Sequence, residues 1–289
     1  MPTIEENRNY WSSDYDWSNR GQEWNQGYGG TQNCWEWCVH PRIRSLLPTG
    51  HILELAPGYG VWTNFLRPFC TKMTLVDLAP NCIEHCQARF GDANMSYHTN
   101  DGSDLSFVAD GSIDMVFSWN SLVHAEAETM HSYVQQICRK LKPGGVGFIH
   151  HSNLGAHRNE AGEQQIPEGD RHWRGSNMTA KQFREDCKAG GVWCYNQEII
   201  PWGSDYLIDC ISVFIKPEDG PTPDQIHETQ VRENMDHWEP ARALRKIDGM
   251  FRKPGVPEEA VAEVKITPVG QTPPAPASPL AKLRAMLTG

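Results

Sequence analysis

A glycine-containing run follows the first strand-like apolar segment of the chain. Residues 54–60 read Glu-Leu-Ala-Pro-Gly-Tyr-Gly, and the two glycines allow a ligand to approach the backbone closely. A dinucleotide fingerprint needs a third small residue three positions after Gly60, where Thr63 stands, and the Lys-Ser/Thr pair of a triphosphate loop is missing. A carboxylate at Glu54 is unfavourable for a pyrophosphate but suits a ligand that carries an ammonium and a sulfonium group. The run therefore predicts a site for a positively charged ligand.

Polar residues also follow the next two apolar segments. Asp77 ends the segment 73–77 and precedes Leu78, and a carboxylate at this edge can accept both ribose hydroxyls of an adenosine. The alternative role of Asp77, a helix cap, is weakened because Pro80 already opens the next helix. The third segment is followed by Asn100, Asp101 and Gly102. Their polar atoms could contact an adenine edge or simply form a turn.

Histidines at the same predicted edge are candidates for a general base. The chain carries them at His124, His150 and His151. A histidine can take a proton from a weakly acidic hydroxyl near neutral pH. Adjacent strand residues point to opposite faces, so His150 and His151 cannot both face one pocket through alternation. We expect His151, further toward the sheet edge, to be the base. His124 is the second candidate, although it could instead bond nearby backbone at a helix start.

Metal binding is an open alternative at this edge. A divalent cation such as magnesium could be held if the closing strands return there, by the residues His150, His151, Asp205 and Asp209. Magnesium prefers oxygen ligands, which makes a set rich in histidine a poor one. A zinc site is less favoured, because structural zinc sites pair their ligands more tightly than the residues Cys82, His85, Cys86 and His98 do.

Alternating strand and helix patterns position these residues. Strands are predicted at 51–55, 73–77, 95–98, 114–118, 146–150, 192–200 and 206–215, and helices at 61–66, 80–90, 130–141 and 179–188. This alternation predicts an α/β fold with a mostly parallel, seven-stranded sheet and helices on both faces. Ligands of such sheets bind outside the carboxyl ends of the strands, where all of the candidate residues fall.

The two ends of the chain differ from its centre. Residues 1–45 hold five of the eleven tryptophans, which predicts an N-terminal cap packed on the central domain, 46–216. Residues 217–289 hold eleven of the twenty prolines. They predict a C-terminal extension with short helices at 225–234 and 240–250 and a Pro-rich, partly disordered tail. Within the tail, 278–287 could form an amphipathic helix that docks to a partner or a membrane surface.

Charge and hydropathy exclude several functions. The chain has 26 Lys and Arg against 36 Asp and Glu, a net charge of −10, which argues against binding nucleic acid. It has no apolar stretch of the length that spans a bilayer. The acidic, polar start of the chain does not look like a secretory signal, so we expect a cytoplasmic protein without a disulfide framework.

In this order and spacing, the motifs resemble those of class I S-adenosylmethionine-dependent methyltransferases. The resemblance covers residues 20–216 and includes 54–60, Asp77, Asp101, the fourth-strand segment 114–124 and the turn 141–145. It implies a Rossmann-like fold with S-adenosylmethionine as cofactor. The cofactor-binding residues would be Glu54, Ala56, Pro57, Gly58, Gly60, Asp77, Leu78, Asn100, Asp101, Gly102, Ser118 and Trp119.

Three further blocks, 24–32, 121–126 and 147–153, look similar to methyltransferases that act on sugars and bacterial polysaccharides. This similarity implies an O-methyltransferase with a histidine base and a small-molecule or oligosaccharide acceptor. The Asn-Pro signature of base-directed N-methyltransferases is absent, because Ser121 follows Asn120. Alternatives are a non-sugar natural product as acceptor, a nicotinamide-dependent oxidoreductase, and a catalytically inert scaffold.

Overall fold

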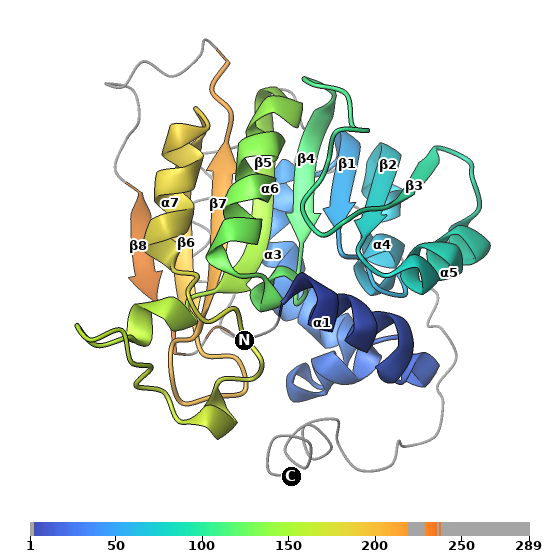
Figure 1. The fold of residues 1–289 in the computed structure, drawn as a ribbon. Helices are drawn as coiled ribbons and strands as arrows, with labels where there is room; N and C mark the ends of the chain where they lie inside the picture. Colours follow the sequence, from blue (N-terminus) through green and yellow to red (C-terminus); the bar gives the residue numbers. More distant parts are fainter. Residues whose placement is uncertain (1–2, 219–228, 236, 238–289) are drawn as a thin grey trace.

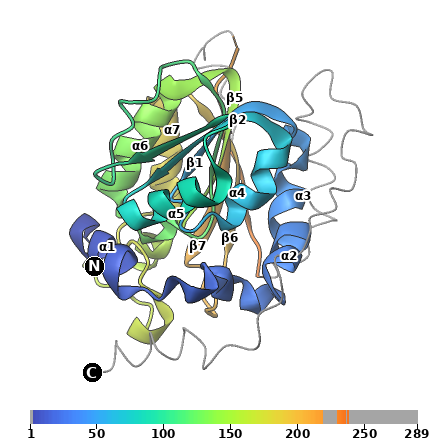
Figure 2. The ribbon, with the colours of Figure 1, turned by 90° about the vertical axis from the view of Figure 1, so that its right-hand side faces the viewer.

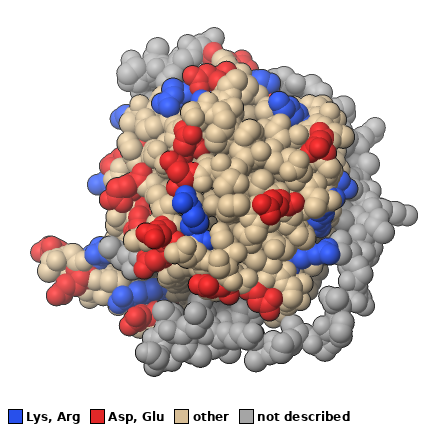
Figure 3. Space-filling model, turned by 45° about the vertical axis from the view of Figure 1, so that its right-hand side comes forward, with Lys and Arg blue, Asp and Glu red and all other residues tan. Residues whose placement is uncertain are grey.

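The computed structural model describes residues 3–218, 229–235 and 237 of the 289-residue chain. The expected helix at 240–250, the Pro-rich tail and the docking helix at 278–287 lie outside the described residues. Within the described part of the chain, no helix is both long enough and apolar enough to cross a membrane. On the face in Figure 3, acidic and basic side chains are interspersed around uncharged ones.

The centre of the fold is an eight-stranded sheet with strand order β3-β2-β1-β4-β5-β7-β6-β8 (Figure 1). The strands are β1 (Thr49–Leu55), β2 (Cys70–Asp77), β3 (Met95–Thr99), β4 (Ile113–Ser118), β5 (Leu141–Ser152), β6 (Trp193–Ile200), β7 (Asp209–Ile215) and β8 (Gln230–Glu233). β7 runs antiparallel to β5 and β6, and the other pairs are parallel. The mostly parallel sheet is as predicted.

The number of strands was underestimated. The segment 225–234 was expected to be helical, but its described part contains β8, which pairs in parallel with β6. A strand at the edge of a sheet offers unpaired backbone groups, and β8 satisfies those of β6. The eighth strand is therefore a correction to the predicted seven-stranded sheet.

Helices cover both faces of the sheet (Figure 2). They are α1 (Ile4–Asn9), α2 (Thr31–Cys34), α3 (His40–Ile43), α4 (Val61–Leu66), α5 (Pro80–Phe90), α6 (Ala127–Lys140) and α7 (Ala180–Ala189). Buried side chains of α3, α4 and α5 share one hydrophobic cluster, and those of α6 and α7 share the other. α5 begins at a proline and ends before Gly91, as its sequence predicts.

The N-terminal segment reaches the sheet as a series of short helical turns. After α1 come turns at Tyr10–Asp14, Trp17–Asn19 and Gln22–Tyr28, before the chain enters α2. Rings from this segment contact Tyr59, His124, Trp173 and Trp202, all of which lie in loops near the carboxyl ends of strands. The segment therefore forms a roof over the edge of the sheet where ligands of α/β proteins bind.

Candidate functional site

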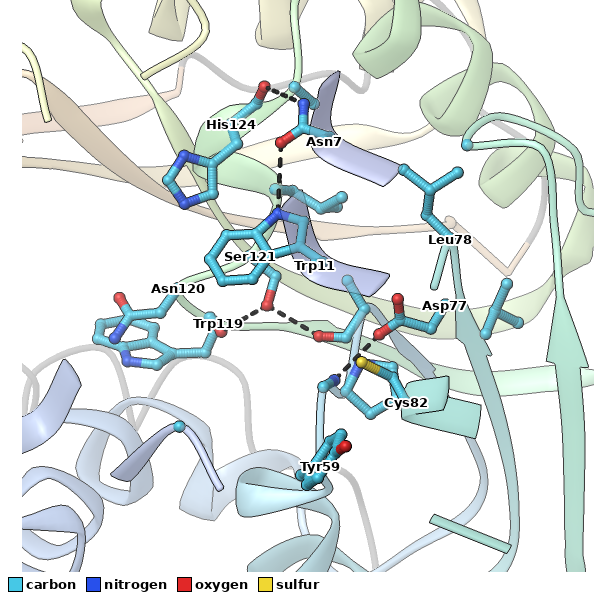
Figure 4. Close-up of a pocket in the computed structure, with 18 of the residues that line it drawn as sticks. Asn7, Trp11, Tyr59, Asp77, Leu78, Cys82, Trp119, Asn120, Ser121 and His124 are labelled. Carbon is cyan, nitrogen blue, oxygen red and sulfur yellow. Dashed lines mark hydrogen bonds between the residues drawn. The ribbon is translucent and has the colours of Figure 1, made fainter. Parts of the chain in front are cut away.

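A cavity of about 320 Å³ lies at the carboxyl ends of β1, β2 and β4, under the N-terminal segment. Its floor comes from the loops after these strands, and its roof includes Ile4, Asn7, Trp11, Trp17 and Trp24. Asn7 links the two sides, because its Nδ2 donates to the His124 carbonyl at 3.4 Å and its Oδ1 accepts from Trp11 Nε1 at 3.4 Å (Figure 4). The cavity is thus enclosed by parts of the chain that are far apart in sequence.

The turn after β1 is shaped by backbone conformations that favour glycine. Ala56 and Gly58 have φ of 54° and 55°, in the left-handed region. A Cβ on Gly58 would lie 2.8 Å from the Trp17 ring, so only glycine fits beneath this part of the roof. Ala56, Pro57 and Gly58 all line the cavity, where the sequence predicts them.

Asp77 also lines the cavity and is held rigidly by backbone. Its Oδ2 accepts from the Gly58 N–H at 3.0 Å, and its Oδ1 accepts from the Ala79 N–H at 2.9 Å. Each carboxylate oxygen still has a lone pair for a further donor. Burial raises the pKa of Asp77 to about 6, so the carboxylate is mostly ionised at neutral pH. Asp77 can therefore accept a pair of ligand hydroxyls.

Two residues of the glycine-rich run lie beneath the cavity rather than in its lining. Glu54 is buried, and its Oε2 accepts from Thr63 Oγ1 at 2.6 Å. Burial raises the pKa of Glu54 to about 8, and its Oε1 is buried without a hydrogen-bond partner among the described residues. Gly60 precedes α4 with φ of 75°, and a Cβ there would clash with Phe90. Both residues shape the turn, and their contact with the cofactor stays a prediction.

The loop after β3 contributes less than predicted. Gly102 lines the cavity together with Leu78, but Asp101 is exposed and its Oδ1 accepts from the N–H groups of Ser103 and Asp104. This is the turn-forming alternative, and an adenine contact through Asp101 stays a prediction. Asn100 lies outside the cavity lining and donates to the Tyr133 hydroxyl at 2.9 Å.

The end of β4 supplies one predicted residue and one that was missed. Ser118 is buried outside the cavity lining and donates to the Leu55 carbonyl at 3.0 Å, which joins β4 to β1. Trp119 lines the cavity as predicted. Asn120, the next residue, lines it too and has φ of 59°. The only sequence signal for Asn120 was its place directly after a strand.

His151 does not reach the cavity. Its ring is buried and stacks on Phe183 of α7 at 4.4 Å, on the face covered by α6 and α7. Its Nδ1 donates to the Ser152 carbonyl and its Nε2 pairs with Ser212 Oγ, both at 2.8 Å. Both ring nitrogens are therefore engaged inside the core. This placement contradicts the expectation that His151 is the base.

His150 points to the other face but is also buried, behind Trp119. The two ring centres are 4.6 Å apart. His150 Nδ1 accepts from the Asn120 N–H at 3.3 Å, so its Nε2 carries the proton and donates to Asp209 at 3.1 Å. Arg174 donates to both oxygens of Asp209, at 2.8 and 2.9 Å. His150 is thus a buried link outside the cavity lining, which does not fit its inclusion among the three candidate bases.

The proposed metal ligands are not brought together. His151 faces away from His150, Asp205 is exposed, and Asp209 is occupied by Arg174 and His150. Across residues 3–218, 229–235 and 237, no group of three or more His, Cys, Asp and Glu side chains is arranged to hold a metal ion, and this includes the four candidate zinc ligands.

His124 is the one predicted base that lines the cavity. Its Nδ1 donates to the Trp173 carbonyl at 2.8 Å, which leaves Nε2 as an acceptor. Burial, aided by the positive charge of Arg174, lowers the pKa of His124 to about 3. The imidazole is therefore neutral across the physiological pH range.

A smaller cavity, of about 20 Å³, lies beside the main one and shares Trp11, Trp24, Asn120 and His124 with it. We call it the aromatic chamber; its other lining residues are Tyr10, His172, Trp173, Arg174 and Trp202. Both amide atoms of Asn120 and Nε1 of Trp202 are buried there without a hydrogen-bond partner among the described residues. The tryptophan-rich start of the sequence pointed to a cap, but not to these particular contacts.

Comparisons with known proteins agree with this architecture. Residues 52–145 match the family model described as a methyltransferase domain. Phosphoethanolamine N-methyltransferase 1 of Triticum aestivum is 25% identical over 187 residues, which cover 61% of this chain and 35% of the relative. The chain thus spans about a third of that curated relative.

Two solved structures align with parts of this chain. A candidate sarcosine dimethylglycine methyltransferase of Galdieria sulphuraria aligns with a TM-score of 0.50 at 17% identity, over 63% of this chain and 85% of the other. An S-adenosylmethionine-dependent methyltransferase of Mesorhizobium loti aligns with a TM-score of 0.47 at 16% identity, over 64% and 100%.

Residues 52–145 are thus similar to a methyltransferase domain, and the sheet that contains them has a Rossmann-like fold similar to that of the Galdieria structure.

Proposed function

We propose that this protein transfers a methyl group from S-adenosylmethionine to a hydroxyl of a sugar or glycan. The observation that carries the proposal is that the two cavities adjoin and have four lining residues in common. Asp77 and Gly58 line the main cavity, and the tryptophans of the aromatic chamber lie beside it. A cofactor in the main cavity would therefore lie next to aromatic side chains against which an acceptor can pack.

The main cavity fits the nucleoside part of the cofactor. Asp77 offers a carboxylate to ribose hydroxyls, and Leu78 and Leu122 offer apolar contact to a base. Gly58 and Gly102 let a ligand approach the backbone. S-adenosylmethionine, when bound, supplies an electrophilic methyl group on a sulfonium. The residues of this chain align the reactants and exclude water.

The aromatic chamber suits a neutral, hydroxyl-rich acceptor. Tryptophan rings offer flat apolar faces to the C–H side of a sugar, and Trp11 and Trp24 are shared with the main cavity. The unpaired groups are neutral hydrogen-bonding groups, namely the Asn120 amide, the Trp202 indole N–H and His172 Nε2. Sugar hydroxyls can both donate to and accept from such groups. In this proposal His124 Nε2 takes the proton that the hydroxyl loses.

A second candidate acceptor is the nitrogen of a small amine. The low pKa of His124 favours it, because a neutral amine attacks through its own lone pair and needs no strong base. Aromatic faces also stabilise an ammonium product. The names of the wheat and Galdieria relatives, both amine methyltransferases, support the same candidate.

Label transfer from S-adenosylmethionine to two acceptor panels tests the proposal. One panel contains methyl hexosides and deoxyhexosides, and the other contains ethanolamine, phosphoethanolamine and sarcosine. We expect transfer to the saccharides. Transfer to the amines alone would replace the sugar proposal with the second candidate. Transfer to neither, with the cofactor product still bound, would favour a non-sugar natural product or an inert scaffold.

Substitution of His124 separates the two chemistries. For a hydroxyl acceptor, His124→Ala should lower turnover by about 10²- to 10⁴-fold, because general-base catalysis typically contributes that much. For an amine, we expect a fall of less than about tenfold. S-adenosylhomocysteine affinity, measured by calorimetry, should not change in either case. Full saccharide transfer by this variant would remove His124 from the mechanism.

A further inference from the structure

Asn120 lies where the main cavity meets the aromatic chamber and contributes to the lining of both. Its side-chain oxygen and nitrogen are buried and have no hydrogen-bond partner among the described residues. Buried amides are nearly always paired, because an unpaired one loses its bonds to water without replacement. The unpaired amide at this junction is therefore ready to bond a ligand that enters the chamber.

The backbone of Asn120 is held in a conformation that few residues adopt. Its φ of 59° lies in the left-handed region, which is costly for side chains other than glycine, although Asn tolerates it best. Such strained positions cluster at functional sites, where the surrounding structure enforces them. Here the enforcing contact is the Asn120 N–H, which donates to His150 Nδ1 at 3.3 Å.

Behind Asn120, a buried chain of charged and polar groups fixes the His150 ring. Because a backbone N–H can only donate, His150 Nδ1 is unprotonated and Nε2–H points to Asp209. Arg174 donates two hydrogen bonds to the Asp209 carboxylate, and its guanidinium lies 4.7 Å from the centre of the Trp202 ring in the chamber. The exposed fractions of the His150 and Asp209 side chains are 0%, and that of Arg174 is 3%. This series of hydrogen bonds thus connects the wall of the aromatic chamber to the backbone of Asn120.

The charges of Arg174, Asp209 and His150 balance in one protonation state. Burial alone would raise the pKa of Asp209, but Arg174 and His150 hold it well below its ordinary value. Burial lowers the pKa of His150 despite the neighbouring Asp209. Ionised Asp209, charged Arg174 and neutral His150 therefore coexist at neutral pH, and the direction of each hydrogen bond is fixed.

We propose that the Asn120 amide orients the acceptor for methyl transfer, and that Arg174, Asp209 and His150 form a positioning relay that holds Asn120 in place. This inference rests on the proposed function, because it needs an acceptor beside Asn120, which lines the main cavity as well as the small chamber. It assigns specificity to a residue that the sequence analysis did not select. The relay residues do not act on the acceptor themselves.

Asn120→Gly is the most direct test, because glycine keeps the left-handed backbone and removes only the amide. If Asn120 were merely a turn residue, glycine would preserve or improve the protein. We expect kcat/KM for the acceptor to fall by about 30-fold, since the substrate loses one or two hydrogen bonds in a dry site. S-adenosylhomocysteine affinity should stay within about twofold and the melting temperature should not fall.

Asn94 provides a matched control. It also has a left-handed backbone, with φ of 62°, but it is exposed in the loop before β3. Asn94→Gly should leave both transfer and cofactor affinity unchanged. Unchanged transfer in Asn120→Gly as well would overturn the proposed role of the amide.

The relay is tested by graded changes at His150. His150→Asn can place an amide oxygen close to the position of Nδ1 and so accept from the Asn120 N–H, whereas His150→Ala cannot. We expect Asn to recover most of the kcat/KM that Ala loses, and hydrogen exchange at the Asn120 amide to be faster in Ala alone. Equal losses of turnover with unchanged exchange would show that the relay does not position Asn120.

The same assays distinguish this inference from the proposed function. The variants are measured on whichever panel, saccharide or amine, the wild-type protein methylates. Transfer to amines alone would overturn the sugar proposal and leave the Asn120 test intact. The inference assigns Asn120 to a saccharide or amine acceptor, so absence of transfer to both panels would overturn it together with the proposed function, while S-adenosylhomocysteine titration would still report an intact cofactor site.

Discussion

Two buried carboxyl groups near the ends of β1 and β2 differ because their hydrogen-bond donors differ. Asp77 accepts two backbone N–H groups, which partly offset burial, and its pKa is raised only to about 6. Glu54 accepts from one hydroxyl, and its pKa is raised by burial to about 8. Hydrogen bonds to the charged form favour it, so Asp77 is the carboxylate prepared for a ligand and Glu54 is mostly protonated at neutral pH.

Glu54→Gln is expected to change how stability depends on pH. In the folded protein the Glu54 pKa is about 8, above its ordinary value of 4.5. Between pH 4.5 and pH 8 the folded protein therefore keeps a proton on Glu54 that the unfolded chain has lost. Stability should therefore fall as pH rises from 4.5 to 8, by roughly 1.4 kcal/mol for each unit of pKa shift. The Gln variant lacks this term and should melt higher than wild type at pH 8.5 but not at pH 5. Thermal melts of the two ligand-free proteins measure this. The same difference in melting temperature between variant and wild type at both pH values would contradict it.

Asp77→Asn should weaken binding of S-adenosylhomocysteine by about 10- to 100-fold, because hydrogen bonds to a charged acceptor are worth about 1.5 to 3 kcal/mol. Calorimetric titration measures the loss. Asp110→Asn is a suitable control, since Asp110 is exposed and pairs only with Lys140 at the opposite end of β4. An unaltered dissociation constant in Asp77→Asn would place the ribose elsewhere.

At the scale of elements, α1 and the turns that follow it make the sheet edge into a closed site. Ile4 and Asn7 of α1 line the main cavity, and a Cβ on Gly102 would lie 2.9 Å from Ile4. None of the residues of α1 is fully buried. The contacts of α1 are therefore directed to the cavity more than to the core.

Deletion of residues 1–9 should therefore lower cofactor affinity more than stability. We expect the dissociation constant of S-adenosylhomocysteine to rise about tenfold, as apolar cover worth one to two kcal/mol is lost, with a change of only a few degrees in melting temperature. Calorimetry and thermal melts on the same protein provide both values. Full affinity after the deletion would mean that α1 does not roof the cofactor.

The sequence predicted the elements well because their signals are local. The strands, the proline and glycine that bound α5, and the turn at Gly58 follow from apolar periodicity and backbone preference. Alternation also predicted that His150 and His151 point to opposite faces, which the structure confirms. The burial of both depends on what covers each face of β5, and that is set by tertiary packing. The hydrogen bond from Asn120 to His150 and the pairing of β8 with β6 likewise join residues that are far apart in the sequence.

At the scale of the whole molecule, the start of the C-terminal extension is tied to the N-terminal cap. The Glu198 carboxylate of β6 forms ion pairs with Arg42 of α3 at 2.6 Å and with Arg232 of β8 at 2.9 Å. Although burial alone would raise the pKa of Glu198, these cations hold it at about 2. His237 pairs with the Tyr28 hydroxyl at 2.8 Å, and its carbonyl accepts from Arg42. Residues 229–235 and His237 therefore close the sheet edge and brace the cap.

Two truncations separate this bracing segment from the rest of the tail. Removal of residues 251–289 should leave transfer and melting temperature unchanged. Removal of residues 229–289 takes away partners of buried groups around Arg42 and Glu198, each worth about 1 to 3 kcal/mol, and should lower the melting temperature by about 3 to 10 °C. Equal effects of the two truncations would show that β8 and His237 do not stabilise the folded protein.

The central claim is that an adenosine lies across the ends of β1, β2 and β4 with its ribose on Asp77. A crystal structure of the complex with S-adenosylhomocysteine tests it most directly. The account predicts both ribose hydroxyls within hydrogen-bonding distance of the Asp77 carboxylate and the sulfur directed toward Asn120 and the aromatic chamber. A nucleoside bound at another edge, or Asp77 turned away from it, would contradict the account.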